Sequence, residues 1–169
     1  MKWLILRGVA TAALPVVNEL DSWVRFLRAH AAVTRRLNSD LVSEHGLTLN
    51  DYEVLLTLRH SPGRRLRRVD LSERLILTPS GITRLLEGLE REGFVARVAC
   101  DVDRRVCYAQ LTDEGVEKLR RAAVTHVHGI DQLFLTLFTA RQRAQLASLL
   151  GRLVGAGSGE GDCAGERVS

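Results

Sequence analysis

The sequence predicts a mainly α-helical protein with one small β-hairpin. Apolar residues recur at three- and four-residue steps over long stretches, as they do on the buried face of a helix. Ala, Leu and Arg are abundant while aromatic residues make up only 5% of the chain, and this composition favours helix. Two short runs, FVARVAC (94–100) and VCYAQL (106–111), are instead rich in β-branched and aromatic residues and flank a polar turn, which predicts a hairpin.

The chain has 169 residues, enough for one domain with an additional interface element. Its net charge of +4 permits a nucleic acid or an anionic membrane as partner but selects neither. Arg7 and Gly8 interrupt the apolar start of the chain, and no apolar stretch approaches the roughly 20 residues of a membrane-spanning helix. Three scattered cysteines do not form a disulfide framework. These observations predict a cytoplasmic protein without a membrane partner.

A long helix is expected from about Asn18 to His45, with Gly46 as its C-terminal cap. It needs a partner surface along its whole length, because an apolar stripe runs from end to end. The stripe consists of Leu20, Trp23, Val24, Leu27, Ala31, Thr34, Leu37 and Leu41. A capping box from Thr48 to Asp51 starts a second helix. The buried face of this second helix is expected to contain Tyr52, Val54, Leu55 and Leu58.

A basic stretch, RRLRR (64–68), follows the stop signal Ser61-Pro-Gly63 and precedes a short helix from about Val69 to Leu75. The apolar contacts of this short helix are expected from Leu71, Leu75 and Ile76.

The next helix has the clearest start signal in the chain. Thr78 is a favourable N-cap, and Pro79 fits the first turn, where no N–H is needed. The helix is expected to end near Glu92, before Gly93. Its buried face should contain Ile82, Leu85, Leu86 and Leu89. A helix, a turn, a helix and then a hairpin make a winged helix-turn-helix, in which the turn DVDRR (101–105) is the tip of the wing.

The first turn of that helix keeps small or polar residues away from its apolar face. They are Ser80, Gly81, Thr83 and Arg84. Such residues suit a helix that enters the major groove of DNA, because bulky side chains would hold the helix away from the bases. A capped surface helix without any DNA contact is an equally good interpretation of this stretch alone.

Two further helices complete the chain. One opens at Thr112 and is expected to continue to about Phe138, and a capping box from Thr139 to Gln142 starts the last helix, which ends near Val154. One small domain cannot cover this much apolar surface, so the pattern predicts an isologous dimer. The predicted organisation is an N-terminal extension (1–17), a helical dimerisation region (18–46 and 113–154), a winged helix-turn-helix domain (47–112) and a disordered tail (155–169).

Three segments resemble the MarR family, the multiple-antibiotic-resistance-type transcriptional regulators. They are LTLNDYEVLLTL (47–58), LSERLILTPSGITRLLEGLEREGFVAR (71–97) and DRRVCYAQLTDEG (103–115). The resemblance covers about residues 20–153. It implies a dimeric winged-helix protein that binds a pseudo-palindromic site in double-stranded DNA, a repressor that a small aromatic or anionic ligand releases. The alternative function is a winged-helix module that binds only other proteins.

The resemblance also implies roles for single residues. Ser80, Gly81, Thr83 and Arg84 fall on the recognition helix, and Asp103 and Arg105 fall on the wing pair in which the carboxylate orients the arginine towards the minor groove. A planar guanidinium suits the negative potential of a narrow minor groove. Arg104 is expected at a phosphate.

A ligand pocket is expected between the dimerisation helices and the winged domain, with an arginine to pair with an anionic ligand. The candidate lining residues are Trp23, Arg64, Arg65, Arg67 and Arg68. Core packing is the alternative role of the tryptophan, and phosphate contacts or a solvated loop are the alternatives for the arginines.

Cys100 and Cys107 flank the wing turn and are candidates for facing one another across the hairpin. A disulfide there would couple oxidation to DNA affinity, but we expect two reduced, small apolar residues. His126 and His128 lie on different faces of a helix, which argues against a zinc pair. The sequence has no nucleophile–base pair, phosphate-binding glycine loop or metal-ligand cluster at usable spacing, so we expect no enzyme, no cofactor and no metal site.

Overall fold

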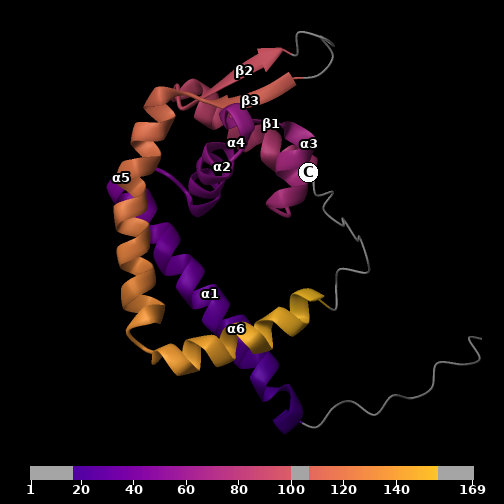
Figure 1. Ribbon diagram of the computed structural model, residues 1–169, viewed down its shortest axis with the longest axis vertical. Helices are drawn as coiled ribbons and strands as arrows, with labels where there is room; N and C mark the ends of the chain where they lie inside the picture. Colours follow the sequence, from indigo (N-terminus) through magenta and orange to yellow (C-terminus); the bar gives the residue numbers. More distant parts are fainter. Residues whose placement is uncertain (1–16, 100–106, 156–169) are drawn as a thin grey trace, which may run out of the picture.

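The computed structural model describes residues 17–99 and 107–155. Helices dominate it, and a small antiparallel sheet lies at one end of the molecule (Figure 1). The helices are α1 (Val17–His45), α2 (Leu49–Arg59), α3 (Arg68–Arg74), α4 (Pro79–Arg91), α5 (Asp113–Ile130) and α6 (Ala140–Gly155). The strands are β1 (Arg65–Arg67), β2 (Val95–Ala99) and β3 (Cys107–Leu111). The mainly α fold with a winged helix-turn-helix is confirmed.

Capping side chains set the helix starts where the sequence predicts them. The N–H of Thr48 donates to Asp51 Oδ2 at 2.9 Å, and the N–H of Asp51 donates to Thr48 Oγ1 at 3.1 Å, which completes the capping box of α2. The same reciprocal arrangement joins Thr139 and Gln142 at the start of α6. Gly46 ends α1 with a φ of +66°, in the left-handed region that glycine enters without a steric penalty.

The hydrophobic core lies in the lobe formed by α2, α3, α4 and the sheet. Its fully buried side chains include Val54, Leu55, Leu58, Leu71, Ile82 and Leu86. The C-terminal half of α1 and the N-terminal half of α5 join this lobe through Leu41, Leu119 and Ala122. The rest of these two helices runs away from the lobe towards α6 (Figure 1).

The sheet contains a strand that the sequence did not predict. The strand order is β1-β3-β2, and β1 pairs with β3 so that Leu66 lies opposite Ala109. Leu66 is buried, whereas Arg65 and Arg67 are exposed on the other face. The sequence gives no strand signal over the basic stretch 64–68, because the three residues of β1 are too few to show an alternating pattern. Pairing with β3 decides its conformation.

Two other expectations were wrong. α5 does not continue to Phe138: the helix widens into a π-helical turn at Asp131–Leu135, where the N–H of Thr136 donates to Asp131 O, five residues back, at 3.0 Å. Ile76 does not supply apolar contacts to α3, since its side chain is 93% exposed. Its φ of +53° turns the chain after α3 and directs the side chain away from the core.

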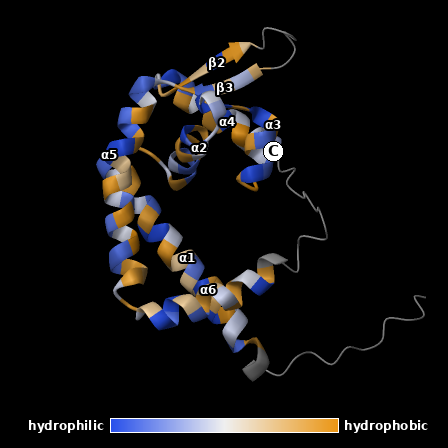
Figure 2. Ribbon diagram, in the orientation of Figure 1, coloured by the Kyte–Doolittle hydropathy of each residue, from blue (hydrophilic) through white to orange (hydrophobic). Residues whose placement is uncertain are grey.

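Apolar side chains are exposed along the helices that leave the lobe. Figure 2 shows hydrophobic residues along α1, α5 and α6. The exposed set includes Leu20, Trp23, Leu27, Val124, Val127, Leu137, Leu149 and Leu153. None of the helices in residues 17–99 and 107–155 combines the length and apolar character needed to cross a membrane.

Candidate nucleic-acid interface

The N-terminal turn of α4 presents the predicted recognition residues to solvent. Ser80 and Arg84 are exposed, and Gly81 and Thr83 are half-buried. The opposite face of α4 is anchored in the core by the buried residues Ile82, Leu86 and Leu89. Arg84 forms no ion pair with any residue of the described chain, so its guanidinium is available to an external partner.

Thr78 holds this turn in place. Its Oγ1 accepts a hydrogen bond from the N–H of Gly81 at 3.1 Å, and the hydroxyl of Thr83 donates to Pro79 O at 2.8 Å. A Cβ on Gly81 would lie 3.1 Å from Thr78 Oγ1, so the small residue leaves room for the cap. The helix N-terminus also carries a partial positive charge, which favours a phosphate nearby.

The four arginines of the stretch 64–68 do not act as one cluster, because their surroundings differ. Arg64 donates to Asp113 at 2.8 Å, and Arg67 makes a two-bonded ion pair with Asp70 at 2.8 and 2.7 Å. The hydrogen bond from Arg67 lowers the pKa of Asp70. Two of the four charges are therefore balanced by a neighbouring carboxylate.

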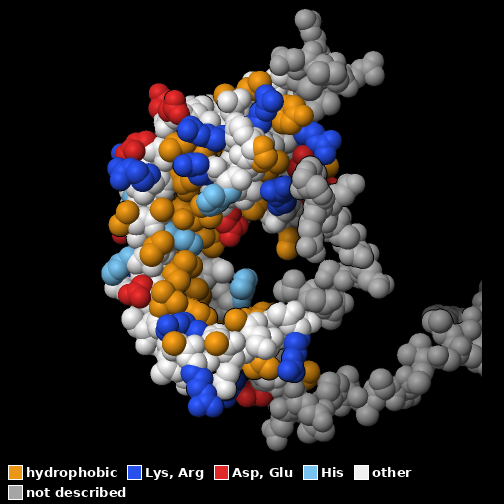
Figure 3. Space-filling model, in the orientation of Figure 1, with side chains coloured by type: hydrophobic (Ala, Val, Ile, Leu, Met, Phe, Trp, Pro, Cys, Tyr) orange, Lys and Arg blue, Asp and Glu red, His pale blue; other side chains and the backbone are white. Residues whose placement is uncertain are grey.

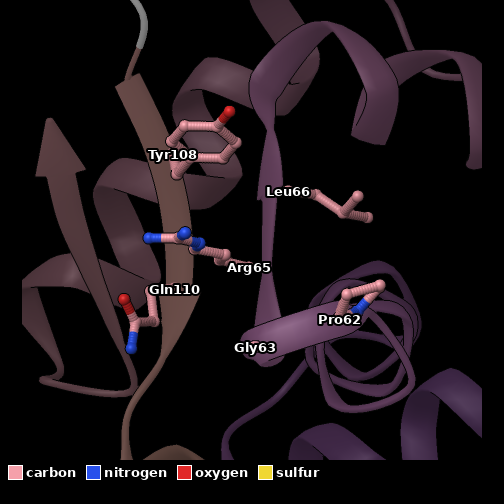
Figure 4. Close-up of a pocket in the computed structure, with 6 residues that line it drawn as sticks. All are labelled: Pro62, Gly63, Arg65, Leu66, Tyr108 and Gln110. Carbon is pink, nitrogen blue, oxygen red and sulfur yellow. The ribbon is translucent and has the colours of Figure 1, made fainter. Parts of the chain in front are cut away.

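Arg65 lies on the outer face of the sheet, between Tyr108 and Gln110 (Figure 4). Its guanidinium carbon is 5.2 Å from the centroid of the Tyr108 ring, a cation–π distance. These residues line an open groove of about 550 Å³ together with Pro62, Gly63 and Leu66. Arg68 is half-buried and lines a small void beside α4.

Trp23 lies far from these arginines within one chain. It belongs to the N-terminal half of α1, at the opposite end of the molecule from β1 (Figure 1). Its side chain is 52% exposed and contacts Phe26, with the two ring centroids 6.0 Å apart. The single chain therefore does not bury Trp23 in a core, and the structure does not bring the expected pocket residues together.

A different hollow, which the sequence reasoning missed, lies between α1 and α2. It has a volume of about 420 Å³ and is lined by His30, Ala31, Thr34, Arg35, Asn38, Leu49 and Asn50. Asn38 fixes its floor, because its Oδ1 accepts from the N–H of Leu49 at 2.9 Å. The available signal was the four-residue spacing of His30, Thr34 and Asn38 along α1, although Thr34 was counted as part of its apolar stripe.

The predicted wing residues Asp103, Arg104 and Arg105 lie outside the described residues, as does Cys100. The two strands that lead to them are paired, and the residue opposite Cys107 is Ala99. In this register Cys107 therefore lies opposite Ala99, which does not support the alternative in which Cys107 directly faces Cys100.

The face of the molecule in Figure 3 carries both basic and apolar side chains. Figure 3 shows several Lys and Arg side chains over the winged lobe and a continuous apolar column over the helices below it. The lobe therefore offers positive charge to a polyanion, and the helices offer apolar area to another protein surface.

Comparison with known proteins identifies the family of this chain. The family model described as "MarR family" matches residues 47–107. Sco3205, a MarR family transcriptional regulator from Streptomyces coelicolor solved in complex with DNA, superposes with a TM-score of 0.81 at 30% identity, over 88% of this chain and 97% of its own.

Two curated relatives are similar over most of their length. The HTH-type transcriptional regulator MhqR of Bacillus subtilis (strain 168) is 28% identical over 120 residues, which are 71% of this chain and 81% of MhqR. The homoprotocatechuate degradative operon repressor of Escherichia coli is 30% identical over 118 residues, 70% of this chain and 78% of the repressor. With a recognition helix, a paired wing and relatives of this similarity, the chain belongs to the MarR family of DNA-binding transcriptional regulators.

Proposed function

We propose that the protein is a homodimeric repressor that binds a pseudo-palindromic DNA site in the cytoplasm and leaves it when a small aromatic or anionic ligand binds. The observation that carries the proposal is the first turn of α4. It is exposed, small and polar, it is capped by Thr78, and it ends in the unpaired cation Arg84.

In the proposed complex, α4 enters the major groove. Ser80, Thr83 and Arg84 meet base edges, and the absence of a side chain on Gly81 permits close approach. Arg105, oriented by Asp103, enters the adjacent minor groove, and Arg104 meets a phosphate. A relative solved with DNA and a relative named as a repressor support this function.

The dimer is proposed from the apolar surface outside the lobe. Two apolar side chains of α6, Leu149 and Leu153, are 54% and 58% exposed and lie one turn apart. Leu20 and Trp23 on α1 are similarly uncovered. A second copy would bury these surfaces and place the two lobes so that α4 and its symmetry mate meet half-sites about 10 bp apart.

We place the ligand in the hollow between α1 and α2 rather than beside the arginines 64–68. Arg35 is exposed and forms no ion pair with the described residues, so it offers a guanidinium to a carboxylate or phenolate. His30, Thr34 and Asn38 add hydrogen-bonding groups. Trp23 lies two turns before His30 on α1 and remains a candidate for the outer wall.

The test compares Arg84→Ala with Arg91→Ala, a matched arginine at the other end of α4. Duplexes are first selected from a randomised pool by the wild-type protein, and affinities are then measured by fluorescence anisotropy at several salt concentrations. Arg84→Ala should lower the affinity for selected duplexes by roughly 10-fold or more, as expected for the loss of one base contact. It should change the affinity for random duplexes far less, and Arg91→Ala should change neither affinity. If the wild type selects no sequence, the protein is a protein-binding module instead.

A further inference from the structure

The turn between α3 and α4 contains an isoleucine in a conformation that suits glycine. The N–H of Leu77 donates to Ser72 O at 3.0 Å and the N–H of Ile76 donates to Glu73 O at 3.4 Å, the paired bonds of a Schellman motif. Ile76 occupies the left-handed position of this motif, with a φ of +53°. A β-branched residue is rarely found there, because its methyl groups crowd the backbone.

Within residues 17–99 and 107–155, the side chain of Ile76 contributes no packing to the core. Leu75 and Leu77, on either side, pack against the core and hold the turn in place. Ile76 itself is 93% exposed, the most exposed large apolar residue in the described chain. Backbone strain combined with an exposed apolar side chain is a cost that no packing in the described part of the chain offsets. Uncompensated strain of this kind is characteristic of contact sites.

The position of Ile76 restricts what it contacts. It lies two residues before the N-cap Thr78 and four before Ser80, so at most about 14 Å of chain separate it from the exposed first turn of α4. The major groove is about 12 Å wide. When α4 lies in that groove, Ile76 is therefore close enough in the chain to reach the edge of the groove. The apolar group that a major groove offers is the 5-methyl of thymine.

We propose that Ile76 is a specificity-determining residue that packs against a thymine methyl group beside the bases read by α4. This inference rests on the proposed DNA-binding function and adds a contact to it. The strained turn presents the side chain to the groove in a fixed orientation, so little conformational entropy is lost when the contact forms.

The test uses four proteins and two kinds of DNA. The proteins are the wild type, Ile76→Gly, Ile76→Val and the control Val69→Ala, which removes another exposed apolar group, 62% exposed, from the far end of α3. The DNA is a duplex selected by the wild type and a series in which deoxyuridine replaces one thymine in each half-site, which deletes only the methyl group.

At one thymine position, deoxyuridine in both half-sites should weaken wild-type binding roughly 16-fold, about fourfold for each buried methyl group. Ile76→Gly should bind the thymine duplex as weakly as the wild type binds the deoxyuridine duplex, and deoxyuridine should cause no further loss of affinity. Its melting temperature should be at or above that of the wild type, because the backbone strain is relieved. Ile76→Val should retain the thymine dependence, and Val69→Ala should bind like the wild type.

The inference is overturned if Ile76→Gly binds the selected duplex as tightly as the wild type, or if every deoxyuridine substitution affects both proteins equally. Either result leaves the proposed DNA-binding function intact. A wild type that selects no DNA overturns both.

Discussion

At the scale of single residues, Gly115 shows how little space separates the sheet from α5. A Cβ at this position would lie 2.1 Å from the carbonyl oxygen of Phe94 and 2.7 Å from Leu111 Cδ1. The Thr112 hydroxyl also donates to Phe94 O, at 3.1 Å, which fixes the position of this carbonyl group. The strand and the helix touch at this glycine.

Gly115→Ala should therefore destabilise the protein by about 3 kcal/mol, as overpacking against fixed backbone does. Urea unfolding followed by circular dichroism measures the change. The control is Gly88→Ala in α4, where the nearest atom to a new Cβ is a flexible arginine nitrogen at 4.0 Å. Alanine there should stabilise by roughly 0.5–1 kcal/mol through helix propensity. Equal effects of the two substitutions would contradict the close approach.

At the scale of elements, α2 and α5 meet through an aromatic pair. The rings of Tyr52 and His126 have centroids 4.4 Å apart, and the buried His126 Nδ1 has no hydrogen-bond partner among the residues that the structure describes. Burial lowers the pKa of His126, because the charged imidazolium would lose its hydration. The contact therefore requires the neutral ring.

This contact makes stability depend on pH in a defined direction. The unfolded chain protonates His126 more readily than the folded protein does. The neutral His126 therefore costs no stability above about pH 6.5, and the free energy of unfolding decreases as the pH falls below that value. Burial raises the pKa of the neighbouring Glu53, so protonation of Glu53 increases the free energy of unfolding as the pH falls further. We expect the melting temperature of the wild type to fall between pH 7.5 and 5.5, and that of His126→Phe, which keeps the ring contact, to fall less. Parallel curves would exclude His126 as the cause.

At the scale of the whole molecule, the exposed apolar surface of α6 predicts the oligomeric state. Leu149→Glu combined with Leu153→Glu should convert a dimer to a monomer, because two carboxylates would be buried at the interface. Light scattering at micromolar concentration measures the mass. Val69→Glu, an equally exposed position on α3, should leave the mass unchanged. A monomeric wild type would rule out the dimer outright.

Ligand release also belongs to the whole molecule, since the hollow at α1 and α2 must affect α4. An aromatic acid at millimolar concentration should raise the melting temperature and release the selected duplex. Arg35→Ala should bind DNA normally but fail to respond. Arg36→Ala, whose guanidinium is already paired with Asp40 at 3.0 Å, should respond like the wild type. If both variants respond, the ligand binds elsewhere.

Local sequence patterns determined most helix boundaries and much of the core. Thr48, Thr78 and Thr139 start helices as expected because an N-cap acts within three residues of itself. The buried face of α2 contains the four expected residues because helical periodicity is also local. The family was likewise recognisable, since its motifs are contiguous stretches of chain.

Only the tertiary structure decided what depends on distant partners. β1 exists because β3 pairs with it. Arg64 pairs with Asp113 and Arg65 lies over Tyr108, and both partners are more than forty positions away in the sequence. The hollow at Arg35 forms where α2 packs on α1. Ile76 looks apolar enough for a core, but its left-handed backbone directs it outwards. Periodicity and capping act over a few residues, whereas strand pairing, ion pairs and hollows form between segments that the fold brings together.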